Sequence, residues 1–415
     1  MIAMSEPIVA QVGRPIRLLT RDFSENKYVY YRQMLEQAPI WRGTIAAMKI
    51  HLVPGYEDCR SLLQDPRFVR NRTTATGGSR FPFPVPKSLS LVAESMIISD
   101  GADHSRLRSL VNKGFTSRSI QPFASRIDGL THELLGRAKK SEPIDLIGAY
   151  CAPIPMTVIS EMVGISKTQM PRFTNSLRVL TKGFSGWNIL RTMLWDLRGV
   201  AKFFEALIAE KRSDPQDDIL TRLIDAEEDG DRLNQDELIA TVFLLILAGY
   251  ETTTHLIGNG VITLLQHPEQ LERLRDEPEL IDSAVEEILR HRGPIHGSKP
   301  SFALEDTMLH GTLIKKGSPV MPVFGAANHD PRIFDEPDEF DIARQSNRHL
   351  GFGFGEHFCL GAQLARMEAR IAIRNLIESH PNLRLAVAPE ELKPQRVPLW
   401  HRYEKIPVIL GQSGS

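Results

Sequence analysis

One stretch of the sequence constrains the fold more than any other. From Gln235 to His267 the chain reads as a single helix, with Asn234 and Glu237 as an N-terminal capping pair and Pro268 as its stop. Thirty-odd residues at about 1.5 Å each give a rod of roughly 45–50 Å, long enough to cross a whole domain. Because its first half is apolar nearly all round, we expect other elements to enclose it.

The other patterns indicate a mainly α protein with a small β part. Hydrophobic residues make up 42% of the chain and charged residues 24%, which is ordinary for a globular protein. We expect residues 1–415 to form a single domain, with β-containing parts near 30–70 and 295–415 and a helical bulk at 100–290. Further helices are predicted at 103–115, 121–140, 155–182 and 195–212, and strands at 45–53, 308–314, 319–324 and 402–410.

The charge balance excludes several classes of protein. Lys and Arg number 50 against 51 Asp and Glu, so no global basic field is present to hold nucleic acid or an anionic membrane. The first residues lack the basic start and apolar core of a signal peptide. The most apolar run, Leu238–Gly249, is shorter than the roughly 20 residues of a membrane-spanning helix. We therefore expect a soluble cytoplasmic protein without a membrane anchor.

Only one of the three cysteines has a neighbourhood that suggests chemistry. Cys59 and Cys151 are isolated, which is typical of small buried hydrophobic residues. Cys359 stands in the segment Phe352–Gly361, FGFGEHFCLG, directly before a helical pattern at 362–376. Free N–H groups and the positive end of a helix dipole favour a thiolate at such a place.

The residues around this cysteine suit a flat, metal-bearing group. Gly353 and Gly355 permit backbone turns that are closed to residues with a Cβ, and Gly361 leaves room for a flat group against the backbone. Phe352 and Phe358 supply an apolar wall that keeps water from the sulfur. A thiolate held in this way is a soft ligand for iron.

The segment resembles the haem-binding loop of the cytochrome P450 superfamily, F-x-x-G-x-x-x-C-x-G. Further motifs follow in the order and spacing of that family, so the resemblance covers nearly the whole chain and suits the soluble bacterial members. The matching residues are Phe352, Gly355, Cys359 and Gly361 in the loop, Ala248–Thr253 (AGYETT) in the long helix, Glu287 and Arg290 of an E-x-x-R pair, Arg344 at the end of the loop from Asn328, and His104 and Arg108 of an H-x-x-x-R pair.

The resemblance implies a triangular helical prism with haem b between the long central helix and the helix after Cys359, and O2 as co-substrate. Cys359 would be the metal ligand, and His104, Arg108 and His357 would contact the haem propionates. The other residues expected against the haem are Phe352, Gly353, Gly361, Ala248 and Gly249.

Glu251 and Thr252 are the expected catalytic pair. An acid and a hydroxyl in a buried apolar helix are costly unless they have partners or work to do. One alternative is a locally satisfied kink, in which the Thr252 hydroxyl bonds back to the carbonyl of Ala248. The resemblance implies instead that Thr252 assists dioxygen activation in a kinked groove, while Glu251 relays protons from outside.

Two charged pairs also have alternatives. Glu287 and Arg290, three residues apart, could form a surface ion pair worth a few tenths of a kcal/mol. The resemblance implies that they bind Arg344 and lock the core beneath the haem, a structural role. His104 and Arg108 could be ordinary charges on a solvated helix, although propionates would suit them better.

One position departs from the family pattern. Many bacterial relatives carry an arginine five residues before the Asp of an E-D pair, where it contacts a propionate. Counting back from Asp306 places Ser301 there. Either Lys299 reaches the propionate instead, or that contact is absent.

The expected substrate pocket is apolar, which suggests a neutral hydrophobic small molecule. Residues 77–90 would be either a surface loop or a flap over a pocket. The resemblance implies that the segments 77–98 and 175–190 line this pocket. The alternative is that these residues belong to an ordinary hydrophobic core. The pocket residues expected from the resemblance are Phe83, Met96, Leu180, Phe243, Ile295, Leu399 and Trp400.

The implied reaction is a monooxygenation: one atom of O2 enters the substrate, by hydroxylation or epoxidation, at the expense of two electrons. No flavin or iron–sulfur module follows the haem segment, so we expect a monomer that takes electrons from a separate ferredoxin or flavodoxin with its NAD(P)H-dependent reductase. Arg106, Lys113 and Arg366 could form the docking patch. Oxidative coupling, dehydrogenation, peroxide-driven oxidation and a non-catalytic haem-binding or sensing role are the alternatives; the Glu251–Thr252 pair argues against the last two.

Overall fold

The computed structural model of the protein describes residues 12–78, 95–166, 168–171, 173, 197–228 and 231–411. Its helices are α1 (Arg21–Glu25), α2 (Lys27–Gln37), α3 (Tyr56–Gln64), α4 (Arg72–Thr76), α6 (Gly101–Gly114), α7 (Ser117–Ile120), α8 (Phe123–Arg137), α9 (Pro153–Val163), α12 (Leu197–Ser213), α13 (Ile219–Asp225), α14 (Gln235–Gln266), α15 (Pro268–Asp276), α16 (Ile281–Arg292), α17 (Phe324–Ala327) and α18 (Ala362–Ser379). Its strands are β1 (Ile16–Arg17), β2 (Trp41–Ile45), β3 (Met48–Val53), β4 (Phe68–Val69), β5 (Ile144–Asp145), β6 (Glu227–Glu228), β7 (Asp231–Arg232), β8 (Ser301–Ala303), β9 (Thr307–Leu309), β10 (Thr312–Ile314), β11 (Pro319–Pro322), β12 (Arg384–Leu385) and β13 (Pro407–Ile409).

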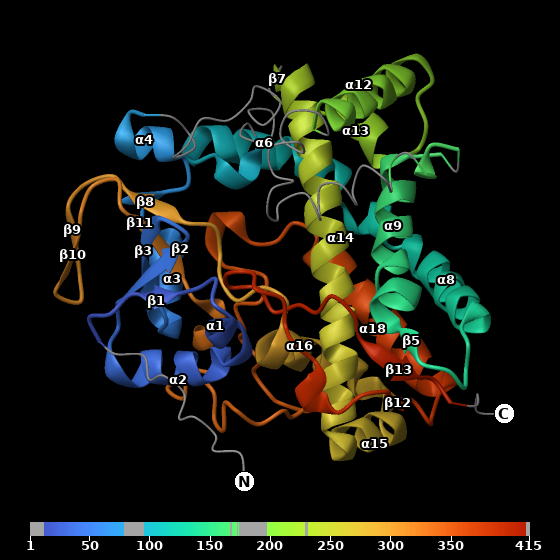
Figure 1. Cartoon of the computed structure of the whole chain (residues 1–415). Coiled ribbons are helices and arrows are strands. Elements are labelled where there is room, and N and C mark those ends of the chain that lie inside the picture. Colours follow the sequence, from blue (N-terminus) through green and yellow to red (C-terminus); the bar gives the residue numbers. More distant parts are fainter. Residues whose placement is uncertain are drawn as a thin grey trace, which may run out of the picture.

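The long helix predicted from the sequence is α14, which runs through the middle of the molecule (Figure 1). Its predicted capping box is confirmed: the Glu237 N–H donates to Oδ1 of Asn234 at 2.9 Å, and the Asn234 N–H donates to Oε2 of Glu237 at 2.9 Å. By length and composition α14 could cross a membrane, but 61% of its most apolar window is buried inside the molecule. It is therefore the core helix of this fold.

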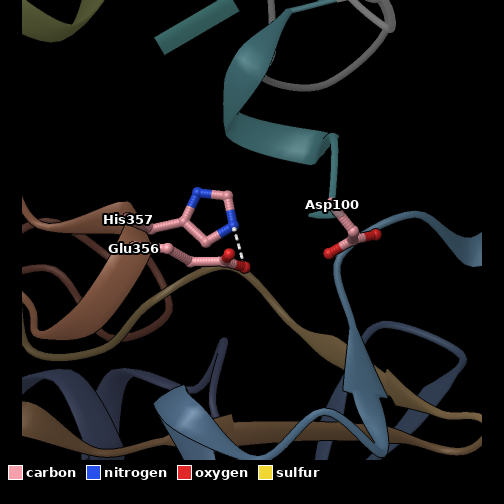
Figure 2. A group of neighbouring side chains, drawn as sticks. All are labelled: Asp100, Glu356 and His357. Atoms are coloured by element: carbon pink, nitrogen blue, oxygen red, sulfur yellow. Dashed lines mark ion pairs between the residues drawn. The ribbon is translucent and has the colours of Figure 1, made fainter. Parts of the chain in front are cut away.

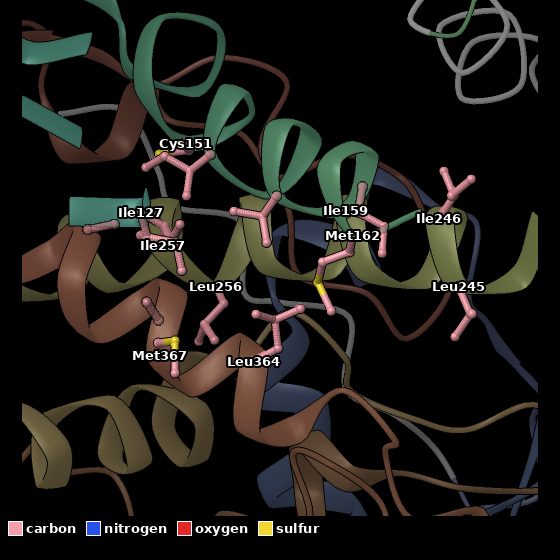
Figure 3. Close-up of a cluster of buried hydrophobic side chains, with 14 of the residues drawn as sticks. Ile127, Cys151, Ile159, Met162, Leu245, Ile246, Leu256, Ile257, Leu364 and Met367 are labelled. Carbon is pink, nitrogen blue, oxygen red and sulfur yellow. The ribbon is translucent and has the colours of Figure 1, made fainter. Parts of the chain in front are cut away.

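Several helices pack against α14, chiefly α9, α16 and α18. Figure 3 shows part of the resulting core, where Ile159 and Met162 of α9, Leu256 of α14 and Leu364 of α18 lie together. Gly260 of α14 permits α18 to pack closely, because a Cβ there would lie 2.8 Å from Cδ1 of Ile373.

The main sheet joins segments from both ends of the chain. Its strand order is β1-β2-β3-β11-β8-β4, with β11 parallel to β3 and antiparallel to β8. In Figure 1 this sheet lies to one side of α14, and α8, α9 and α18 lie to the other. A second sheet, in the order β12-β13-β5, ties the C-terminal segment to the helical part.

Two strand predictions need correction. The segment 308–314 is a hairpin of β9 and β10 and not one strand, because His310 (φ 46°) and Gly311 (φ 75°) form a left-handed turn between them. The segment 45–53 likewise contains a turn, so that β2 ends at Ile45 and pairs antiparallel with β3. Alternating hydrophobic residues predicted the extended backbone correctly, but such a pattern does not show where a chain reverses.

The helix predicted at 155–182 is α9, which ends earlier. Gly164 adopts a left-handed conformation with φ 77°, a common way for a helix to stop. The pocket residues predicted at Phe83 and Leu180, and the segment 175–190, lie outside the described residues, as does most of 77–98.

Candidate functional site

Cys359 lies in a tight loop directly before α18. Its N–H donates to the carbonyl of Phe352 at 2.9 Å, which closes the loop. Gly353 and Gly355 both have φ 74°, the left-handed conformation that residues with a Cβ rarely adopt. The turn geometry expected from the two glycines is therefore present.

The surroundings of the Cys359 sulfur favour a thiolate more than those of the other cysteines do. Burial raises the pKa of the Cys359 thiol, but the Gly361 N–H and the positive charges of Arg108 and Arg366 oppose this. For the other two cysteines burial dominates and nearby carboxylates add to it, so their pKa values rise much further. Cys359 is the cysteine best suited to bind a metal ion as a thiolate.

The central helix has an accessible section in an otherwise buried length. Ala248 is exposed and the following residues through Thr252 are partly exposed, whereas Ile246 and Thr253 on either side are buried. The Thr252 hydroxyl donates to the carbonyl of Ala248 at 2.5 Å, so the predicted back-bond exists. The expected catalytic pair thus lies in a partly exposed section of the helix.

Glu251 has a partner that sequence reasoning missed. Its Oε1 accepts a hydrogen bond from Nη1 of Arg402 in the C-terminal segment. The guanidinium of Arg402 also lies over the ring of Trp400, 5.4 Å from its centroid. Asn259, two turns along α14, holds the same segment by donating to the carbonyl of His401 at 2.8 Å. No local sequence signal connects residues 251 and 402.

His104, Arg108 and His357 gather beside the cysteine loop. The rings of His104 and His357 lie 4.2 Å apart, and the charge of Arg108 reaches the Cys359 thiol. Nε2 of His357 is buried and has no hydrogen-bond partner among the described residues. Burial, followed by the charges of neighbouring cations, lowers the pKa of His357 to about 3, so its ring is neutral.

Two carboxylates stand next to this group, as Figure 2 shows for Asp100, Glu356 and His357. Oε1 of Glu356 lies 3.5 Å from Nε2 of His357, too far and too poorly aligned for a hydrogen bond. Both oxygens of Asp100 already accept backbone N–H groups, from Arg70 at 2.6 Å and Asn71 at 2.7 Å. Their proximity would permit a metal ion, but Asp100 is committed to the backbone and we assign no metal here.

These observations fit a haem. Open space lies around Gly361, where a Cβ would meet no atom within 4 Å, and Ala248 on the central helix is exposed to space as well. The unpaired Nε2 of His357 and the half-buried guanidinium of Arg108 suit the anionic edge of such a group. The predicted haem contacts at Phe352, Gly353 and Gly249 lie on the same two segments.

Glu287 forms the centre of a buried network. Arg290 donates to it twice, from Nε at 2.8 Å and from Nη2 at 2.7 Å, and both side chains are 0% exposed. Nε of Arg344 donates to Oε1 at 3.2 Å, and Nδ2 of Asn347 donates to Oε2 at 2.9 Å. A surface ion pair is therefore the wrong description. The network ties α16 to the chain segment that leads into the cysteine loop.

The structure places the expected pocket residues at different depths. Met96, Phe243 and Leu399 are buried, with at most 8% of each exposed. Ile295 and Trp400 are partly buried and are brought together by an antiparallel backbone bridge.

Glu368 of α18 is a second residue that sequence reasoning missed. It is 2% exposed, and burial raises its pKa to about 8, against a hydrogen bond from Thr253 that lowers it. The carboxyl group is therefore mostly protonated at neutral pH. Its position one helical turn after Leu364 on the apolar face of the helix was the available signal.

Glu368 should make stability depend on pH. An unfolded glutamate titrates near 4.5, so folding takes up a proton between about pH 4.5 and 8. The contribution of Glu368 to the free energy of unfolding is fully present below pH 4.5. It is lost as the pH rises to about 8, by up to about 1.4 kcal/mol per pH unit. We expect Glu368→Gln to flatten the decline of the urea midpoint from pH 5 to 8. Glu378→Gln, an exposed position on the same helix, is the control, and an unchanged slope in Glu368→Gln would contradict the assignment.

Comparison with known proteins gives a consistent result. A family model described as Cytochrome P450 matches residues 16–395. Cytochrome P450 107B1 of Saccharopolyspora erythraea is 38% identical over 394 residues, which cover 94% of this chain and 96% of the relative. Vitamin D(3) 25-hydroxylase of Pseudonocardia autotrophica is 36% identical over 396 residues, covering 95% and 96%. The crystal structure of the myxobacterial cytochrome P450 CYP267B1 in complex with myristic acid is similar with a TM-score of 0.89 at 33% identity, covering 95% of this chain and 99% of the other.

Proposed function

This chain belongs to the cytochrome P450 family, whose members are haem b monooxygenases that use O2, and we propose that it inserts one atom of O2 into an apolar small molecule, by hydroxylation or epoxidation, with two electrons from a separate redox protein. The observation that carries the proposal is the pairing of two features. One is a cysteine flanked by cations, and the other is an accessible glutamate–threonine pair in the core helix.

The residues around the cofactor have distinct tasks. The haem supplies the chemistry of dioxygen activation, which the thiolate promotes by donating electron density. Cys359 is the proposed ligand, and His104, Arg108 and His357 would hold the propionates. The Glu287–Arg290–Arg344 network would keep the cysteine loop in place, because every member is buried or hydrogen-bonded.

Glu251 and Thr252 would deliver protons. Oγ1 of Thr252 donates its hydrogen to the carbonyl of Ala248, so its lone pairs are free to accept a hydrogen bond from a protonated group in the groove. Glu251 would bring protons inward, but its Oε1 is held by Arg402. Proton transfer through Glu251 therefore requires either that its side chain leave Arg402 or that its other oxygen, Oε2, carry the proton.

The proposed substrate is neutral and hydrophobic. Met96, Phe243, Ile295, Leu399 and Trp400 offer an apolar lining with no charge of their own. The names of two similar proteins support the hydrophobic character: one is a vitamin D(3) 25-hydroxylase, and the structure of the other is a complex with myristic acid.

We propose residues 1–415 as one domain, because strands of the N-terminal part of the chain share one sheet with β8 and β11. From the sequence we also propose that it is a cytoplasmic monomer. The electron donor would be a ferredoxin or flavodoxin with its reductase. Among the cations expected in the docking patch, Arg106 pairs with Glu237 and Asp231, and Arg366 pairs with Glu286. The positive charge of the expected docking patch is thus partly neutralised by neighbouring carboxylates.

The function can be tested by oxygen labelling. The holoenzyme is supplied with a ferredoxin, a flavodoxin, their reductases and NADPH, and a hydrophobic library is first screened for ligands that shift the haem spin state. We expect one ligand to yield a product with a single labelled oxygen under 18O2. A product without label would indicate oxidative coupling or dehydrogenation, and turnover only with peroxide would contradict the proposed electron route.

Thr252→Ala is expected to uncouple electron use from product formation. NADPH and O2 would still be consumed, but more than half of the electrons should appear as hydrogen peroxide, because the hydroxyl that manages proton delivery is gone. Product and peroxide per NADPH are the measured quantities, and Thr252→Ser should restore coupling.

Thr254 offers a matched control. Its hydroxyl makes the same back-bond, to the carbonyl of Tyr250 at 2.8 Å, but the residue is buried. Thr254→Ala should stay coupled. Full coupling in Thr252→Ala would remove Thr252 from the mechanism and leave only the satisfied kink.

A further inference from the structure

Arg70 is a buried cation with no ion-pair partner among the described residues. It follows β4 and is 8% exposed. Its guanidinium donates only from Nη1, to the neutral Oγ of Ser298 at 3.0 Å and to the backbone carbonyl of Lys299. Within the part of the chain that the structure describes, no carboxylate lies at ion-pair distance from it. The carboxylates of Asp100 and Glu356 act on its charge from a greater distance, but burial is the larger effect and lowers its pKa, so a further anion in contact with it would stabilise the charge.

Its position in the sheet is informative. Strand β4 pairs antiparallel with β8, with Phe68 opposite Ala303 and Val69 opposite Phe302. The next step of this register places Arg70 opposite Ser301, the position where many family members carry a propionate-binding arginine. Directly opposed residues of an antiparallel pair project to the same face, with Cβ atoms about 4.5–5.5 Å apart. The backbone of Arg70 therefore lies directly beside the position of the missing arginine.

Arg70 also faces the residues expected to hold the propionates. Its positive charge acts on both His104 and His357 and is among the causes that lower their pKa values. Burial lowers the pKa of Arg70 itself to about 10, so it stays charged at neutral pH. Nε and Nη2 donate to no described residue, which leaves the planar edge that binds a carboxylate with two hydrogen bonds.

The alternative left open by the sequence was Lys299. Its ammonium lies near Arg70, because burial and then the positive charge of Arg70 lower its pKa, and its backbone carbonyl accepts the hydrogen bond from Arg70. Lys299 thus orients the arginine through its main chain. We propose that Arg70, reaching across from the neighbouring strand, is the haem-propionate ligand that replaces the arginine absent at Ser301. The inference rests on the haem cofactor of the proposed function.

The test is the rate of haem transfer from the holoenzyme to excess apomyoglobin. Arg70→Gln should lose haem about tenfold faster than the wild type, as expected for a lost hydrogen bond to a charged group. Its reduction potential should fall, because a positive charge near the haem has been removed. Arg67→Gln is the matched control: Arg67 is exposed three residues earlier and pairs with Asp65, so neither quantity should change.

A relocation variant separates propionate binding from a merely structural role. In Arg70→Gln/Ser301→Arg the guanidinium returns from the opposite strand, and both the haem-loss rate and the potential should move back toward the wild type. If Arg70→Gln cannot be isolated with haem, Arg70→Lys decides, since it keeps the charge but loses the planar edge and should lose haem several-fold faster.

Two results would overturn the inference. One is a haem-loss rate and potential equal to those of the wild type in Arg70→Gln, or an unchanged rate in Arg70→Lys if that variant has to decide. The other is faster loss with an unchanged potential that Ser301→Arg does not correct. A wild type without a thiolate–haem spectrum would instead defeat the proposed function itself.

Discussion

Cys359→His is expected to abolish the red-shifted carbon monoxide band of the reduced protein and to reduce oxygen insertion to background. The structure explains why this cysteine matters. Arg108, Arg366 and the Gly361 N–H all favour its thiolate, and the open space at Gly361 lies two residues away. An imidazole at the same place is neutral, so a haem held there would lose the electron donation that a thiolate supplies.

Cys151→Ala is the control for this experiment. Cys151 is fully buried in the core that Figure 3 shows, and its loss should cost some stability but leave the band unchanged. Reduced, carbon monoxide-treated spectra of the three proteins give the answer. A wild type without the band, or a histidine variant that keeps it, would contradict the assignment of Cys359 as the ligand.

Glu287→Gln is expected to have the largest effect on folding. The substitution leaves Arg290 and Arg344 without their shared anion, and Arg290 is wholly buried. Removing one partner of a buried ion pair typically costs about 3–5 kcal/mol. Because a whole domain is usually stable by only about 5–15 kcal/mol, the variant should accumulate poorly and bind little haem. The urea midpoint and the haem content per chain measure both effects.

The same helix supplies a matched surface pair. Asp282 of α16 lies 3.0 Å from Arg370 of α18, with 72% and 39% of the two side chains exposed. Asp282→Asn should cost no more than about 1 kcal/mol, as exposed pairs usually do. Equal losses in the two variants would mean that the Glu287 network contributes no more than an ordinary surface contact.

Most of the secondary structure around α14 could be predicted because its signals are local. The capping pair at Asn234 and Glu237 and the stop at Pro268 determine both ends of the helix within a few residues. The hairpin at His310 and Gly311 was missed because its turn is embedded in a continuous alternating pattern. Where the chain reverses depends on the backbone conformation of the two turn residues, which the hydrophobic pattern does not indicate.

The sequence by itself determined which residues can carry the chemistry: the cysteine loop, the Glu251–Thr252 pair and the E-x-x-R pair are close spacings along one segment each. Only the tertiary structure decided what these residues meet. Arg402 pairs with Glu251 across 151 positions, and Arg70 stands across from Ser301 because β4 and β8 are paired in a particular register. Such contacts depend on how strands and helices pack against one another, and a long-range contact leaves no periodic trace in the chain that forms it.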